Sequence, residues 1–226
     1  MLAAGGASVV VTGRTETEID AVARDIGGTA HRVDLADRAA ADALCAEVGP
    51  VDILVNNAGI AVSAPLSRVD DDQWDRIMEI NATAPFRLCR AVLPGMIERG
   101  WGRVINIASN AGISGYQYST AYCASKHALV GMTRALAVDL GPTGVTINAV
   151  CPGWVETDMA LEAVQRIADK TGRSVVDATR ALERMSPQNR MIQPSEVAHA
   201  VAMLAADDAR GIHGQTIVID GGAVLK

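Results

Sequence analysis

Aromatic residues are scarce in this chain: Phe, Trp and Tyr together make up only 3% of its 226 residues. Hydrophobic residues nevertheless account for 49% of the sequence, so a sizeable core must be built from Ala, Val, Ile and Leu. Side chains of this size suit helices packed closely on a parallel sheet. The length allows one large domain or two small ones, and without a linker or internal repeat we expect a single domain over residues 1–226.

Other patterns are missing too, and each absence argues against a class of protein. No apolar run approaches the roughly 20 residues that span a bilayer, and the N-terminus lacks the cationic start of a signal peptide. The formal charge is −6 without any basic block, which argues against a nucleic-acid partner. The sequence therefore predicts a soluble, cytoplasmic protein with no membrane association.

Cysteine and histidine are too dispersed to form a disulfide framework or a metal site. There are four of each, with no CxxC pair and no histidine cluster at metal-ligand spacing. We therefore expect no metal, and interpret the four cysteines as buried thiols in a reducing compartment: Cys45, Cys89, Cys123 and Cys151.

Short β-branched runs alternate with longer helical patterns along the chain. Strands are predicted at residues 8–12, 31–33, 52–55, 102–108, 145–150 and 216–219, and helices at 17–26, 38–47, 71–98, 120–140, 161–185 and 195–206. Thr17 is the expected N-cap of the first helix, and Pro85 and Pro94 are expected to bend or divide the third. Strands separated by such helices indicate an α/β fold with a doubly wound parallel sheet, which binds ligands beyond the carboxyl ends of its strands.

The segment from Tyr122 to Lys126 carries the clearest candidate chemistry. Residues four apart lie on one face of a helix, and an ammonium beside a tyrosine should lower the pKa of its phenol. Tyr122 is then a plausible general acid or base near neutral pH. The alternative is an amphipathic helix that simply carries Tyr122 and Lys126 on its solvent-exposed face.

Together with this pair, several motifs in order resemble the short-chain dehydrogenase/reductase family. Ser109 precedes Tyr122 by 13 residues, which is the usual interval in that family. The other matching residues run over nearly the whole chain: Asn56-Asn57-Ala58-Gly59, Asn81, Asn148, Pro152-Gly153, Thr157 and Asp220-Gly221-Gly222.

The resemblance implies a Rossmann-like fold and a role for each catalytic residue. Tyr122 would transfer the proton to or from the substrate oxygen while a nicotinamide carries the hydride. Lys126 would lower the pKa of Tyr122 and bind the nicotinamide ribose, and Ser109 would donate to the developing oxyanion. Asn81 would anchor a water that leads protons to Lys126, although a buried asparagine needs partners in any case.

The resemblance also implies a set of cofactor contacts. An arginine after the first strand, Arg14 beside Thr15, favours NADP(H) over NAD(H), although a surface arginine at a turn is the ordinary alternative. The remaining residues expected to contact the cofactor are Asp34, Leu35, Asn57, Ala58, Gly59, Tyr122, Lys126, Pro152, Gly153, Val155 and Thr157.

One part of the family pattern is absent from this sequence. Members begin with a strand, a TGxxxGxG turn and a helix, and this turn holds the pyrophosphate. Here residues 1–6 resemble only the last turn of that helix, so the fold is expected to lack the usual first strand and most of the first helix. Either a preceding segment belongs to the functional protein, or the chain is a truncated member.

The likeness is strongest to reductases of 3-oxoacyl thioesters bound to acyl carrier protein or coenzyme A. Residues 158–193 occupy the place of the substrate lid, and Tyr116, Gln117 and Tyr118 should border the substrate. The lid's cations could receive coenzyme A phosphates or an acidic carrier protein, or could equally be a solvated helix face: Arg166, Lys170, Arg173, Arg180, Arg184 and Arg190. Family members commonly form homodimers or homotetramers, so the alternative function is a non-catalytic partner subunit.

Overall fold

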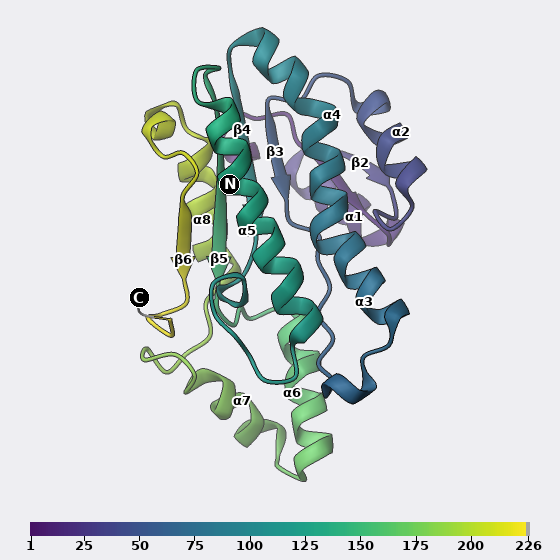
Figure 1. Cartoon of the computed structure of the whole chain (residues 1–226), viewed down its shortest axis with the longest axis vertical. Coiled ribbons are helices and arrows are strands. Elements are labelled where there is room, and N and C mark those ends of the chain that lie inside the picture. The colour runs from purple at the N-terminus through teal and green to yellow at the C-terminus, as the bar shows by residue number, and fades with distance from the viewer. Residues whose placement is uncertain (225–226) are drawn as a thin grey trace.

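The computed structural model describes residues 1–224, in which every strand ladder is parallel (Figure 1). One sheet holds two strands, β1 (Val10–Gly13) and β2 (Thr29–Arg32). The other holds four in the order β3 (Ile53–Asn56), β4 (Gly102–Ile107), β5 (Val145–Pro152) and β6 (Thr216–Ile219). Helices connect consecutive strands, which confirms the predicted α/β architecture with a parallel sheet.

The helices form a layer on each side of the four-stranded sheet (Figure 1). Their bounds are α1 (Glu16–Ile26), α2 (Arg38–Val48), α3 (Asp71–Met78), α4 (Ala84–Arg99), α5 (Thr120–Leu140), α6 (Asp158–Thr171), α7 (Val175–Glu183) and α8 (Pro194–Ala205). Helices α4 and α5 cover one face and α8 covers the other, whereas α6 and α7 lie beyond the carboxyl end of β5. The predicted bounds of α5 and β6 are confirmed without change.

Successive side chains of β4 point to opposite faces of the sheet, so they pack alternately against the two helix layers. Val104 packs with Leu93 and Met96 of α4, whereas the next residue, Ile105, packs with Leu204 of α8 on the opposite face. All eight residues of β5 are buried, as expected for a strand covered on both sides. In residues 1–224, none of the helices combines the length and the apolar character needed to cross a membrane.

The sheet is interrupted between β1 and β3. Within residues 1–224 no ladder joins the β1–β2 pair to the other four strands, as the missing first strand led us to expect. Side chains connect the two parts instead. Arg38 of α2 makes a forked pair with Glu79, at 3.0 and 2.5 Å, and Arg87 of α4 pairs with Asp42 of α2.

Two predicted helix features are wrong in detail. Helix α1 begins at Glu16 with Thr15 as its N-cap, so Thr17 lies inside its first turn. The predicted long helix at 71–98 is divided by a π-helical turn, Glu79–Thr83, which ends two residues before Pro85. The backbone stays helical from α3 through this turn, so the missing N–H of Pro85 falls inside a continuous helical segment, and Pro94 lies inside α4 without ending it.

The cysteine prediction also needs correction. Cys89 and Cys151 are buried, but Cys45 and Cys123 are only partly buried.

A glycine after α5 allows the chain to turn into β5. Gly144 has φ of +78°, and a Cβ there would overlap the carbonyl oxygen of Gly100.

Gly144→Ala should therefore lower the free energy of unfolding by about 2–3 kcal/mol. Gly141→Ala is the matched control, because φ there is −41° and the nearest atom to its Cβ is 3.6 Å away. Equal urea midpoints for the two variants would contradict this account.

Candidate active site

Helix α5 places Tyr122 and Lys126 one turn apart, and the lysine points into the protein. Lys126 is only 4% exposed, and its Nζ donates a hydrogen bond of 2.9 Å to the carbonyl oxygen of Ile107 at the end of β4. The same Nζ lies 5.8 Å from the centre of the Tyr122 ring. Leu129 and Val130 of α5 pack this helix on Ala149 and Cys151 of β5.

Ser109 lies just beyond β4 and meets the same tyrosine. Its Oγ accepts a hydrogen bond of 3.1 Å from the backbone N–H of Ala111, and its side chain acts to lower the pKa of the Tyr122 phenol. Burial raises the pKa of the Cys151 thiol on β5 to about 11, and the Ser109 backbone acts in the opposite direction. The ends of β4, β5 and α5 therefore converge at one hydroxyl.

Burial controls protonation in this cluster. It raises the pKa of Tyr122, and the hydrogen bond from Ser109 acts in the opposite direction. The expected lowering of the Tyr122 pKa by Lys126 is therefore wrong for this structure. The lysine is itself desolvated, and burial lowers its pKa from 10.5 to about 8, opposed by the nearby Cys151 thiol.

Asn81 lies in the π-helical turn and holds the loop that follows β3. Its Oδ1 accepts from the N–H of Ile60 at 2.9 Å, and its Nδ2 donates to the Ile60 carbonyl at 2.9 Å and to Ser125 Oγ at 3.0 Å. A Cβ at Gly59 would lie 3.3 Å from both Asn81 Oδ1 and Lys126 Nζ. A larger residue there would require both side chains to shift by a few tenths of an ångström.

A cavity of about 180 Å³ opens beside this loop, between the two parts of the sheet. Five of the predicted cofactor residues line it: Arg14, Asp34, Leu35, Ala58 and Gly59. The sequence reasoning missed the other lining residues, which are Thr12, Gly13, Val33, Ile60 and Ile80. Most of these residues are neighbours in sequence of predicted residues at the ends of β1 and β2, and Ile80 directly precedes Asn81. The pairing of β1 with β2 and the position next to Asn81 could therefore have identified them.

Some predicted cofactor residues lie outside this cavity. Thr15 caps α1, and Asn57 bonds back to Val55 through its backbone N–H. Val155 pairs with Ile192, and Thr157 precedes α6. These residues follow the strand ends as expected but do not line the 180 Å³ cavity.

Pro152 ends β5, and Gly153 follows it at a tight crossing with the end of β6. The N–H of Gly153 donates to the Ile219 carbonyl at 3.0 Å, and a Cβ at Gly153 would lie 2.8 Å from the Cβ of Asp220. The close approach of Asp220 is thus sufficient to require glycine at this position.

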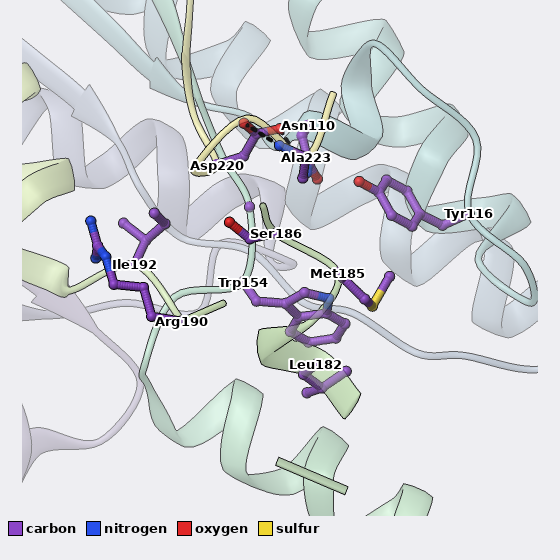
Figure 2. Close-up of a pocket in the computed structure, with 11 residues that line it drawn as sticks. Asn110, Tyr116, Trp154, Leu182, Met185, Ser186, Arg190, Ile192, Asp220 and Ala223 are labelled. Carbon is purple, nitrogen blue, oxygen red and sulfur yellow. Dashed lines mark hydrogen bonds between the residues drawn. The ribbon is translucent and has the colours of Figure 1, made fainter. Parts of the chain in front are cut away.

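A second, smaller cavity of about 10 Å³ lies next to this crossing (Figure 2). Figure 2 shows Tyr116, from the loop before α5, beside Met185 and Trp154, with Asn110 and Asp220 above them in the view. Of these residues only Tyr116 was predicted to border the substrate. Asp220 belongs to the Asp220-Gly221-Gly222 motif, whereas Trp154 and Asn110 carry no motif signal that identifies them as lining residues.

Comparison with known proteins decides the family. The model for "Enoyl-(Acyl carrier protein) reductase" matches residues 1–224. The chain belongs to the short-chain dehydrogenase/reductase family. The resemblance inferred from the motifs is therefore confirmed.

Named members of this family are similar over nearly the whole chain. A D-beta-hydroxybutyrate dehydrogenase from Cupriavidus necator is 36% identical, over all of this chain and 91% of its own length. The 3-oxoacyl-[acyl-carrier-protein] reductase FabG of Escherichia coli is 36% identical, over 99% of this chain and 90% of its own. A variant of actinorhodin polyketide ketoreductase with NADPH superimposes with a TM-score of 0.94 at 37% identity, covering 98% of this chain and 89% of the other.

The lowered pKa of Lys126 has a measurable consequence for stability. Between pH 8 and 10.5 the unfolded chain holds a proton that the folded chain has released, so stability should rise with pH in this window. Relative to Lys126→Met, the wild-type free energy of unfolding should gain up to about 3 kcal/mol across it.

Urea denaturation at several pH values measures this difference. The exposed Lys170→Met variant serves as the control, and its difference from wild type should stay flat. A flat difference for Lys126→Met as well would contradict the burial of a charged ammonium.

Proposed function

We propose that this chain reduces the 3-oxo group of an acyl thioester, using NADPH. The supporting observation is the convergence of Ser109, Tyr122 and Lys126 at the carboxyl ends of β4 and β5. The names of the similar proteins point to the same substrate class, because they include a 3-oxoacyl reductase and a polyketide ketoreductase.

In this proposal Tyr122 is the proton donor. The raised pKa keeps its phenol protonated at neutral pH, which suits a general acid that must give a proton to the forming alkoxide. Ser109, whose side chain also acts to lower the pKa of that phenol, donates to the same substrate oxygen and stabilises its developing charge. When NADPH is bound, it supplies the hydride to the carbonyl carbon.

Lys126 and Asn81 support this proton transfer. An ammonium with a pKa of about 8 can give up and regain a proton near neutral pH, so Lys126 can restore the proton that Tyr122 has lost. It also has donors left for the nicotinamide ribose after its bond to Ile107. Asn81 fixes the loop beside the lysine and would anchor the water that supplies protons to it.

The 180 Å³ cavity fits the adenosine end of the cofactor. Arg14 is exposed at its edge, where a guanidinium can fork onto a 2′-phosphate, with Thr15 beside it. Asp34 and Leu35 would receive the adenine, and backbone at Asn57, Ala58 and Gly59 would approach the ribose. Toward the nicotinamide end, the residues that would hold the cofactor are Pro152, Gly153, Val155 and Thr157.

Residues 158–193 are the proposed substrate lid within a single domain over residues 1–226. Helices α6 and α7 pack on each other through Val164, Ala178 and Leu182. The stems of this segment are tied together, because Val155 pairs with Ile192. Tyr116 and Met185 would then border the acyl group.

The exposed cations of the lid suit an anionic carrier. Arg166 pairs with Glu162, and Arg190 pairs with Glu196. Within residues 1–224 the other four cations of this segment make no ion pair, which leaves them available to coenzyme A phosphates or an acidic carrier protein: Lys170, Arg173, Arg180 and Arg184.

We also propose that the protein works in the cytoplasm as a homodimer or homotetramer. Phe86 of α4 is 45% exposed and Val138 of α5 is 81% exposed, and burial of such apolar side chains favours association. Gel filtration tests this part of the proposal.

NADPH oxidation in the presence of different carbonyl compounds tests the function. Acetoacetyl thioesters should be reduced with a much higher kcat/KM than unrelated ketones or sugars. Equal turnover of all three classes would argue against a thioester-specific reductase. No turnover with any of them would favour the non-catalytic alternative.

Removal of one hydroxyl tests the proton donor. Tyr122→Phe should lower kcat by about 10²–10⁴-fold, because general acid catalysis contributes that much, while NADPH still binds. NADPH fluorescence titration and steady-state kinetics on one preparation separate the two effects. An unchanged kcat in this variant would exclude Tyr122 as the donor.

Arg14→Leu tests the choice of cofactor. Loss of a charge-assisted hydrogen bond to phosphate should weaken NADPH binding by roughly 10–100-fold and leave NADH binding nearly unchanged. Arg24→Leu makes the same change of charge at an exposed position of α1 outside the cavity, so its NADPH affinity should stay near wild type. Parallel losses for NADPH and NADH would show that Arg14 does not bind the 2′-phosphate.

A further inference from the structure

Three consecutive residues of the π-helical turn each hold a different part of the larger cavity. Ile80 lines the cavity itself. Asn81 bonds the backbone N–H and carbonyl of Ile60, another lining residue, at 2.9 Å each. Glu79 accepts a forked pair of bonds from the guanidinium of Arg38, at 3.0 and 2.5 Å. The wall that contains Ile60 and Ile80 is therefore linked directly to α2, where Arg38 lies.

The opposite wall of the cavity leads into the same helix. Asp34 and Leu35 follow β2 and line the cavity. The Asp34 carbonyl accepts the N–H of Asp37 at 2.9 Å, and the side chain of Asp37 caps the N-terminus of α2. Arg38 is the first residue of that helix. This wall and the guanidinium of Arg38 therefore belong to one locally bonded unit, residues 34–38.

Backbone pairing does not set the distance between the two walls. Within residues 1–224 no strand ladder joins the β1–β2 pair to the other four strands. Helix α2 lies alongside α4 instead (Figure 1). Arg87 of α4 pairs with Asp42 and donates to the backbone carbonyl of Arg38 at 3.0 Å. Helix packing and charged side chains therefore set the spacing of the cavity.

The needs of α2 alone do not explain a cation at its first position. The helix dipole disfavours a positive charge in the first turn. The Glu79 side chain, by contrast, is only 14% exposed, and a carboxylate so far removed from water needs a charged partner. A guanidinium that meets both carboxylate oxygens fixes their relative orientation as well as their distance. The pair thus aligns α2 with the π-helical turn at a small cost to α2.

We propose that Arg38 and Glu79 are positioning residues that set the spacing of the cavity walls and, through it, the affinity for NADPH. Neither residue lines the cavity, so both act through the residues that do. Without the pair the walls adopt further spacings, and the apparent affinity falls with the fraction of molecules that can receive the nucleotide. The inference rests on the NADPH binding proposed above.

Neutralisation of one partner tests this role. Glu79→Gln preserves the shape of the side chain and removes its charge. The dissociation constant for NADPH, measured by fluorescence titration, should rise about 3–10-fold, and the KM for NADPH should rise with it. At saturating NADPH, kcat and the KM for an acetoacetyl thioester should stay at wild-type values, because Ser109, Tyr122 and Lys126 lie outside the pair.

A double-mutant cycle isolates the pair. Arg38→Met should weaken NADPH binding as much as Glu79→Gln does, and the two changes together should weaken it no further. Arg38→Lys keeps the charge but loses the fork, so its affinity should be intermediate. Arg38 is 63% exposed, so its variants carry the test if Glu79→Gln does not fold. Additive losses in the double variant would overturn the inference.

Asp52→Asn is the matched control. Asp52 precedes β3 and pairs with Arg99 of α4 at 3.1 Å, and neither residue lines the cavity. The substitution also neutralises one carboxylate of an ion pair that involves a helix of this layer. NADPH affinity should therefore stay near wild type. An equal loss in Asp52→Asn and Glu79→Gln would indicate a general loosening of the fold and would overturn the inference.

Amide hydrogen exchange of the cofactor-free protein gives a readout that needs no catalysis. Residues 29–40 should exchange faster in Glu79→Gln than in wild type or Asp52→Asn, because their unit is no longer tied to the π-helical turn. Unchanged exchange, or faster exchange with unchanged NADPH affinity, would overturn the inference. A wild-type chain that binds NADPH but reduces no thioester would overturn only the proposed reduction, whereas one that binds no NADPH would overturn both.

Discussion

The burial of one ammonium group holds the site together. Lys126 can reach the Ile107 carbonyl only if α5 lies close against β4, and this places Tyr122 over the end of the strand that carries Ser109. Desolvation of an ammonium is costly, so the packing of α5 must offset it. Leu129 and Val130 supply that packing against Ala108 and Ala149. The chemistry is thus linked directly to the core.

A buried polar layer extends the same arrangement toward β3. Asn56 donates to Asn106 at 2.8 Å, Asn106 donates to Thr133 at 2.9 Å, and Thr133 donates to the Leu129 carbonyl at 2.8 Å. These bonds run from β3 through β4 to α5 and require one relative placement of the three elements. Apolar packing alone would allow these elements to shift slightly against one another, whereas such a hydrogen-bond network does not.

The sequence predicted those parts of the structure that local patterns control. Hydrophobic periodicity located α5 and β6 to the residue, and the family resemblance pointed to five of the ten residues that line the larger cavity, Arg14 and Asp34 among them. It failed where tertiary contacts dominate. Asn81 in the π-helical turn bonds the Ile60 backbone, and no local pattern shows either the turn or that long-range bond. The pKa of Tyr122 depends on burial, which charge proximity in sequence does not reveal.

The π-helical turn also makes the length of the third helical region significant. An α-helix turns by about 100° per residue. The wider π-helical turn at Glu79–Thr83 therefore gives α3 a different rotation relative to α4 from the one that a regular helix of the same length would give. Deletion of a single residue there would permit an unbroken α-helix but turn the face that carries Glu79 away from Arg38. Insertions and deletions in residues 79–83 should therefore be far less tolerated than substitutions, because the number of residues, and not only their identity, aligns the two parts of the sheet.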